Sequence, residues 1–349
     1  MEITKTKTTQ SLVDQFLSNL ESFPESVKDT TIQYDLSKLV SILREKEIKE
    51  ICKVGQEGFD QVDKIDIEFG PIVKDLVFEA DLEKSIQEYL VLENKIELEV
   101  SGDLYIFAKQ LALSVKSLYY YKSKQWDEAI AVTIECIALN DYLIHLGMYT
   151  LNLRVIEQNK NISRILLRAG KTEAGFEILK NLFHYMFNGV SNNLNGSILN
   201  YKEFWEKVPI LRESYTYQMF CMIIEDIIRF NFKSPNEYYP NEWYKDLDFE
   251  VNSPDRQLIY NWIYINNQLT KGDYHDFFDS INYYFSQPTS HDYDILKISL
   301  LIELSKFISN SEYQGQKEAL KKLEDYCLNQ FNTYERLRND IKKHHFKKI

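Results

Sequence analysis

Glycine and proline are so scarce in this chain that they decide its fold class. The sequence holds 11 glycines and 7 prolines among 349 residues, less than half of the usual combined share of about 12%. β-Sandwiches, barrels and doubly wound sheets need many tight turns, and tight turns depend on these two residues. Disorder is also excluded, because 44% of the residues are hydrophobic and 14% aromatic. The sequence therefore predicts an all-α protein.

Helical periodicity is strong from Asp103 onward. Apolar side chains recur every three or four residues from Leu104 to Tyr119 and again from Trp126 to Ile137. The polar segment 122–125 separates the two stretches. Two amphipathic helices joined by a short turn form an αα-hairpin, the unit from which helical solenoids are stacked.

The first hundred residues follow a less regular pattern. Two segments, 64–69 and 95–100, alternate apolar and charged residues with a period of two, which is typical of strands. Two interpretations stay open: a small two-stranded β-ribbon, or, for the second segment, the continuation of a helix that begins at Asp81. We expect an irregular, mostly helical N-terminal region over residues 1–102.

The segment 118–130, LYYYKSKQWDEAI, resembles the middle of a tetratricopeptide (TPR) repeat. Tyr120 and Trp126 match the aromatic positions on either side of the turn, and Ala129 matches the small residue where the two helices cross. Cys136 falls on the later small position. The match is partial, since Ser117 replaces the usual glycine or alanine of the first helix and no proline closes the unit.

Three weaker segments place crossing residues at Ala174, Phe277 and Ala319. The resemblance covers about residues 103–330. It implies a TPR-like α-solenoid over residues 103–331, interrupted by an aromatic, proline-containing loop at 231–255. A basic helix end follows at 332–349.

Charge is distributed unevenly along the chain. The net charge is −12, yet residues 336–349 carry six basic side chains and one acidic one. The acidic body disfavours nucleic acid, which leaves the tail 336–349 as the only candidate for such a contact. We expect this tail to be a frayed, solvated helix end.

Four widely spaced cysteines without a CxxC pair favour a reducing compartment. With no signal-like N-terminus and no long apolar run, we expect a cytoplasmic protein that does not enter a membrane.

Motifs for catalysis are missing. The sequence contains no GxxxxGK[ST], GxGxxG or GxSxG motif, and its six histidines form no HExxH. His275 with Asp279 is interpreted as part of a solvated helix face. The pair His291-Asp292 lacks the further histidine and aspartate residues that phosphohydrolases of the HD class need at set distances. The sequence therefore predicts no catalytic residue, no cofactor and no metal.

A protein- or peptide-binding scaffold is the favoured function. In the TPR family the first helix of each unit lines a concave groove, and the resemblance implies Leu111, Ser114, Leu118, Tyr121 and Lys122 in one unit and Trp262 and Asn266 in a later one. Lys160, Arg164 and Arg168 step by four residues and form a basic stripe that suits an acidic peptide. Two alternatives stay open: a peptide-sensing regulator with a TPR-like groove, and a helical enzyme with no recognisable motif.

Overall fold

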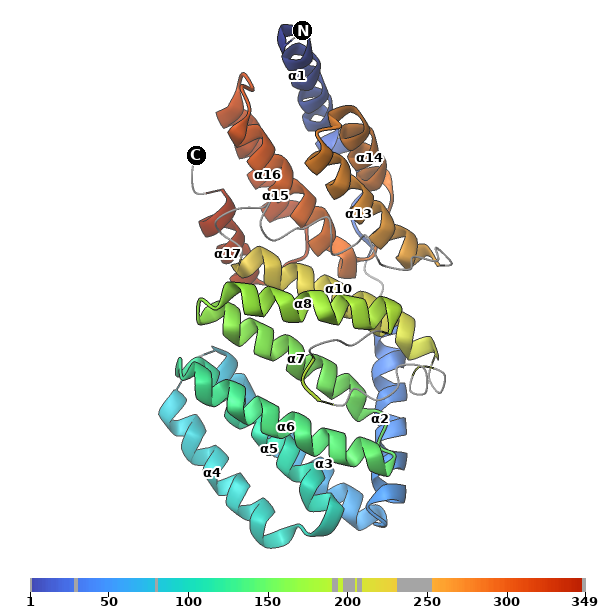
Figure 1. The fold of residues 1–349 in the computed structure, drawn as a ribbon, viewed down its shortest axis with the longest axis vertical. Helices are drawn as coiled ribbons and strands as arrows, with labels where there is room; N and C mark the ends of the chain where they lie inside the picture. Colours follow the sequence, from blue (N-terminus) through green and yellow to red (C-terminus); the bar gives the residue numbers. More distant parts are fainter. Residues whose placement is uncertain are drawn as a thin grey trace. The chain divides into compact units, whose positions relative to one another are not determined.

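The computed structural model describes residues 2–27, 31–78, 81–189, 194–196, 205, 209–230 and 253–346. Within these residues 85% are helical, in fourteen α-helices, and there is no β-strand (Figure 1). The prediction of an all-α fold is confirmed. The loop predicted at 231–255 lies outside the described residues apart from its last three positions.

The chain forms two compact units. The central unit is Thr31–Arg212, and the terminal unit combines Met1–Thr30 with Glu213–Ile349. The boundary expected near residue 102 does not separate units, because helices on both sides of it pack against each other.

Seven described helices build the central unit: α2 (Thr31–Ile51), α3 (Gln56–Phe78), α4 (Leu82–Glu99), α5 (Gly102–Lys122), α6 (Trp126–Leu146), α7 (Leu151–Arg168) and α8 (Thr172–Asn188). Each helix packs against the next one in the chain, and α3 also packs against α5. Short turns join α5 to α6 and α7 to α8 into hairpins, and the consecutive helices α3 and α4 pack against each other in the same way (Figure 1).

The β-ribbon considered for segments 64–69 and 95–100 is wrong, because both segments are helical. The first lies inside α3 and the second ends α4. Buried side chains of α3 recur every three or four residues from Val62 through Phe69 to Leu76. This helical pattern extends well beyond the six-residue alternation, and it leaves Ile67 68% exposed on the opposite side.

The α5–α6 hairpin confirms the predicted close crossing at Ala129. Ala129 is fully buried, and its carbonyl oxygen accepts a hydrogen bond from Ser117 Oγ at 3.1 Å. Ser117 Oγ also lies 2.6 Å from Thr133 Oγ1. The serine that departs from the family pattern therefore links the two helices by hydrogen bonds to Ala129 and Thr133.

In the α7–α8 hairpin the crossing residue is Gly175, so the prediction of Ala174 was wrong by one position. Ser163 Oγ donates to the Gly175 carbonyl at 2.8 Å, repeating the relation of Ser117 to Ala129. A Cβ on Gly175 would lie 2.8 Å from Cγ of Leu167, whereas Ala174 is exposed. Two adjacent small residues leave the register undetermined in the sequence.

Helix α6 lies between α5 and α7. By length and hydropathy alone it is the one described helix that could span a membrane. Its Thr133, Cys136 and Asn140 side chains are fully buried within the unit.

The terminal unit contains α1 (Glu2–Asn19), most of α10 (Pro209–Phe230), α13 (Pro254–Lys271), α14 (Tyr274–Ser286), α15 (Asp294–Asn310), α16 (Gln316–Gln330) and α17 (Glu335–His345). Helix α1 packs against α14 and α16. Its Phe16 ring contacts Phe285 at 5.6 Å and Phe278 at 6.4 Å between centroids. The first helix of the chain thus completes an aromatic core built by its C-terminal part.

The basic C-terminal segment is not a frayed helix end. Leu337, Ile341 and Phe346 of this segment are buried, and α17 packs against α15 and α16. Arg229 of α10 donates from Nε to Asp340 at 3.0 Å. Because the apolar residues recur at four- and five-residue intervals, they lie on one face of α17. That face is buried against the neighbouring helices, while the lysines of α17 are exposed.

One turn geometry recurs in three hairpins, α5–α6, α7–α8 and α13–α14. Its central residue has a left-handed backbone, with φ of +60°, +77° and +74° at Lys124, Gly170 and Gly272. The next residue donates its N–H back to the preceding helix at 2.9 to 3.0 Å in each case. Counting five residues onward makes Ala129, Gly175 and Phe277 equivalent positions, and the predicted site Phe277 is fully buried.

Candidate binding groove

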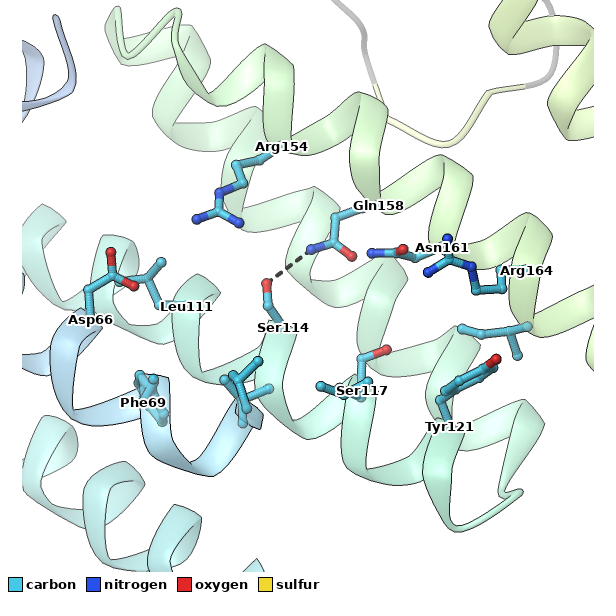
Figure 2. Close-up of a pocket in the computed structure, with 15 residues that line it drawn as sticks. Asp66, Phe69, Leu111, Ser114, Ser117, Tyr121, Arg154, Gln158, Asn161 and Arg164 are labelled. Atoms are coloured by element: carbon cyan, nitrogen blue, oxygen red, sulfur yellow. Dashed lines mark hydrogen bonds between the residues drawn. The ribbon is translucent and has the colours of Figure 1, made fainter. Parts of the chain in front are cut away.

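A groove in the central unit is lined by single faces of α3, α5 and α7 (Figure 2). Its volume is about 370 Å³. The lining positions lie three or four residues apart on each helix, which is why each helix presents one continuous stripe to the groove. They run from Asp66 to Val73 on α3, from Leu111 to Tyr121 on α5, and from Arg154 to Ile165 on α7.

The α3 and α5 sides supply most of the apolar surface. We call Phe69, Val73 and Leu118 the apolar wall. Phe69 is buried and continues into the core of the unit, while Val73 and Leu118 are half-buried. Leu111 and Val115 of α5 also line the groove and are buried.

The α7 side is polar, and we call Arg154, Gln158, Asn161 and Arg164 the α7 wall. Gln158 is 5% exposed, and its Nε2 donates to Ser114 Oγ at 3.0 Å across the groove (Figure 2). Among the described residues, the half-buried Asn161 side chain makes no hydrogen bond, nor does the Gln158 carbonyl. Tyr121 packs its ring against Trp126 at 5.7 Å and its hydroxyl is likewise unpartnered there.

Positive charge predominates along the α7 wall. Arg154 lies near one end of the groove and Arg164 near the other (Figure 2). Arg154 forms an ion pair with Glu157 at 3.7 Å in which both side chains are partly exposed. The one lining carboxylate, Asp66, is already paired with Arg44 of α2 at 3.1 Å.

The thiol beside the groove is not an activated nucleophile. Cys136 Sγ lies 3.4 Å from Ser114 Oγ, and burial raises the pKa of the Cys136 thiol above its usual value. A protonated, buried thiol is inert toward electrophiles. The groove therefore offers hydrogen bonds, charge and apolar contact.

Several predicted residues meet in this groove. Leu118, Tyr121 and Arg164 line it together with Leu111 and Ser114. Lys122 lies at the end of α5, and its Nζ donates to the Val77 carbonyl at 2.8 Å.

The predicted basic stripe is not one exposed surface. Lys160 is 2% exposed, whereas Arg164 is half-buried and Arg168 exposed. With 3.6 residues per turn, each step of four rotates the position by about 40° around the helix. The three residues therefore pass from the buried side of α7 to its surface, and only Arg164 lines the groove.

Trp262 and Asn266 were predicted to line a groove, and the structure corrects this. Trp262 is 0% exposed, its Nε1 donates to Ser299 Oγ at 2.7 Å, and its ring meets Phe220 edge-on at 5.5 Å. Asn266 is buried and donates to the Trp262 carbonyl at 2.8 Å. Helix α15 packs over this face of α13. The face that was predicted to line a groove is therefore part of the core.

Sequence reasoning missed the α3 side of the groove and most of the α7 wall. The α3 face was hidden because its segment was considered as a strand. The stripe from Val62 to Leu76 was the signal that would have placed Phe69 and Val73 on a helix. The signal for Arg154, Gln158 and Asn161 was their spacing of four and three residues.

Histidine–carboxylate pairs occur elsewhere in the terminal unit. His275 and Asp279 form an exposed pair at 3.1 Å, as expected for a solvated face. Buried Asp294 accepts from the Asn332 backbone at 3.2 Å and lies 3.0 Å from His291 Nδ1, so it joins chain segments. The described residues contain no group of three potential metal ligands.

Comparison with protein-family models, with curated proteins and with solved structures found no match.

Proposed function

We propose that this protein is a non-catalytic, TPR-like binding protein whose groove on α3, α5 and α7 holds a segment of another protein or a peptide. One observation carries the proposal. The Asn161 side chain and the Gln158 side-chain carbonyl, which make no hydrogen bond among the described residues, line a groove together with the apolar wall.

The hairpin geometry supports the family resemblance. Ser163 and Gly175 each lie 46 residues after Ser117 and Ala129, and both pairs form the same serine-to-carbonyl hydrogen bond. In both hairpins the crossing residue comes five positions after the turn residue that has the left-handed backbone. A spacing of 46 exceeds the usual 34 residues of a TPR unit, so these helices are longer than those of the family.

The composition of the groove supports a macromolecular partner. Tyrosine and arginine are the side chains most enriched at binding hot spots, because they combine a large contact area with directional hydrogen bonds. Tyr121, Arg154 and Arg164 bring both types into one groove. A partner segment would cover apolar surface and pair the amide groups of the α7 wall at the same time.

Affinity purification with a matched pair of variants tests the proposal. Tagged full-length protein is expressed in its native host as the wild type, as Asn161→Trp, and as Asn94→Trp. Asn161→Trp fills the groove, whereas Asn94 is exposed on α4 and does not line it. We expect a partner that co-purifies with the wild type and with Asn94→Trp, and that is lost with Asn161→Trp. Identical sets of partners in both variants would contradict the proposal.

A further inference from the structure

The groove distinguishes an extended occupant from a helical one. The Asn161 side-chain amide offers a donor and an acceptor, and the Gln158 amide, whose Nε2 already donates to Ser114 Oγ, offers its carbonyl oxygen. These groups match the N–H and C=O of peptide units. A helix uses these backbone groups internally and would leave both amides unmatched. An extended segment presents them outward, so the unused groups of the α7 wall favour an extended chain.

The length and volume of the groove also fit an extended occupant. From Arg154 to Asn161 the α7 axis rises about 10 Å, at about 1.5 Å per residue. An extended chain covers that length in about three residues, at about 3.3–3.6 Å each. The groove volume of about 370 Å³ is at the small end for ligand pockets, which run from about 300 to 1,000 Å³. It suits a short segment rather than a folded element.

The positive charge of Arg154 determines which kind of peptide side chain fits at its end of the groove. The ion pair between Arg154 and Glu157 is long and partly exposed, and such pairs contribute about 0–1 kcal/mol, so a better-placed carboxylate displaces Glu157. Asp66 does not compete, because Arg44 holds it. The net charge of −12 acts mostly beyond the screening length of about 8 Å at physiological salt, so nearby groups set the local field.

We infer that the groove takes an extended peptide segment in which an aspartate or glutamate pairs with Arg154. Its backbone bonds to Gln158 and Asn161, and an apolar side chain two or three residues from the acid packs on the apolar wall. An arginine–carboxylate pair forms two parallel hydrogen bonds, which adds geometric selectivity to the charge. This inference rests on the proposed function and adds the chemistry of the partner.

A positional-scanning library of nine-residue peptides, acetylated and amidated to remove terminal charges, tests the inference on the full-length protein. The wild type is expected to select Asp or Glu, with Leu, Ile or Val two or three positions away. Arg154→Glu should replace the acidic preference by Lys or Arg at the same position, and Arg154→Gln should abolish it. For the best wild-type peptide, fluorescence anisotropy should show at least tenfold weaker binding to Arg154→Glu.

Two control variants separate the contributions. Asn161→Leu should weaken every selected peptide severalfold without changing its charge preference. Arg336→Glu, at an exposed position of α17, should change neither affinity nor preference. Peptide binding without an acidic preference, or with one that Arg154→Glu leaves intact, would overturn the inference while the proposed function stands. If no peptide binds more tightly to the wild type than to Asn161→Trp, both fail.

Discussion

The hairpins α5–α6 and α13–α14 share a turn geometry but differ in what covers their first helix. In the central unit the exposed side of α5 lines a groove, and Tyr121 keeps an unpartnered hydroxyl there. In the terminal unit α15 packs over α13, and Trp262 is fully buried against Phe220 and Ser299. The same local structure therefore yields a binding surface in one unit and core in the other.

The crossing position shows the same contrast. At Ala129 and Gly175, a serine of the preceding helix donates a hydrogen bond to the backbone carbonyl of the small residue. At the equivalent position of α13–α14, Phe277 is buried against Phe278 with a centroid distance of 5.1 Å. The turn fixes the connection between two helices, while the side chains at the crossing and the neighbouring helices decide what the hairpin becomes.

The largest expected effect sharpens this contrast between core and groove. Trp262→Ala should lower the free energy of unfolding by about 3–5 kcal/mol, because it leaves a cavity and removes the hydrogen bond to Ser299. Tyr121→Ala should cost about 1 kcal/mol, the size of one aromatic pair contact. Urea unfolding of the full chain followed by circular dichroism measures both. Equal losses for the two variants would contradict the assignment of Trp262 to the core.

Local signals in the sequence predicted the elements well where periodicity and turn agree. The α5–α6 hairpin was predicted with its second helix from Trp126, where α6 begins. Residues 64–69 were ambiguous because a six-residue window satisfies both the strand and the helix period. The placement of α1 could not be predicted, since Phe16 meets Phe278 and Phe285 through contacts between distant parts of the chain.

The groove was predictable only on α5. Leu118 and Tyr121 followed from the repeat match, because their positions depend on one hairpin. Lys160 and Trp262 failed for tertiary reasons: rotation around α7 buries the first, and α15 covers the second. Which face of a helix stays open depends on the next layer, and a pattern within one helix contains no information about that layer.

Overpacking the crossings tests the corrected register in the central unit. Ala129→Leu and Gly175→Leu should each cost about 1–3 kcal/mol, because the added atoms must separate the helices. Ala174→Leu is the matched control, since Ala174 is exposed and surface changes stay within about 0.5 kcal/mol. Thermal and urea unfolding measure the three variants. A loss for Ala174→Leu larger than that for Gly175→Leu would restore the register expected from the sequence.

Acid should weaken the terminal unit through His345. Its Nε2 donates to the Ile228 carbonyl at 2.8 Å, and burial lowers the pKa of His345 to about 4. The unfolded chain protonates this histidine below about pH 6.5. The stabilising contribution is therefore present above that pH and is lost as the pH falls toward 4. Between pH 7 and pH 5 the loss is about 2 kcal/mol.

His345→Gln keeps a side-chain donor without the titration and isolates this effect. Urea unfolding at pH 7 and pH 5 should show the wild type losing about 2 kcal/mol more than His345→Gln over that interval. An equal loss in the two proteins would mean that His345 does not become protonated on unfolding in this range.

The smallest expected effect concerns the shared turn. Lys124 has a left-handed backbone where the other two hairpins have glycine, and this conformation costs a non-glycine residue about 1–2 kcal/mol. Lys124→Gly removes that cost but adds about 0.4–1 kcal/mol of entropy to the unfolded chain, so a net gain of up to about 1 kcal/mol remains. Gly170→Ala should lose about 1 kcal/mol for backbone reasons alone, since nothing lies within 4 Å of the new Cβ. Melting temperatures of the two variants check these signs, and a stabilising Gly170→Ala would show that the α7–α8 turn does not need its left-handed residue.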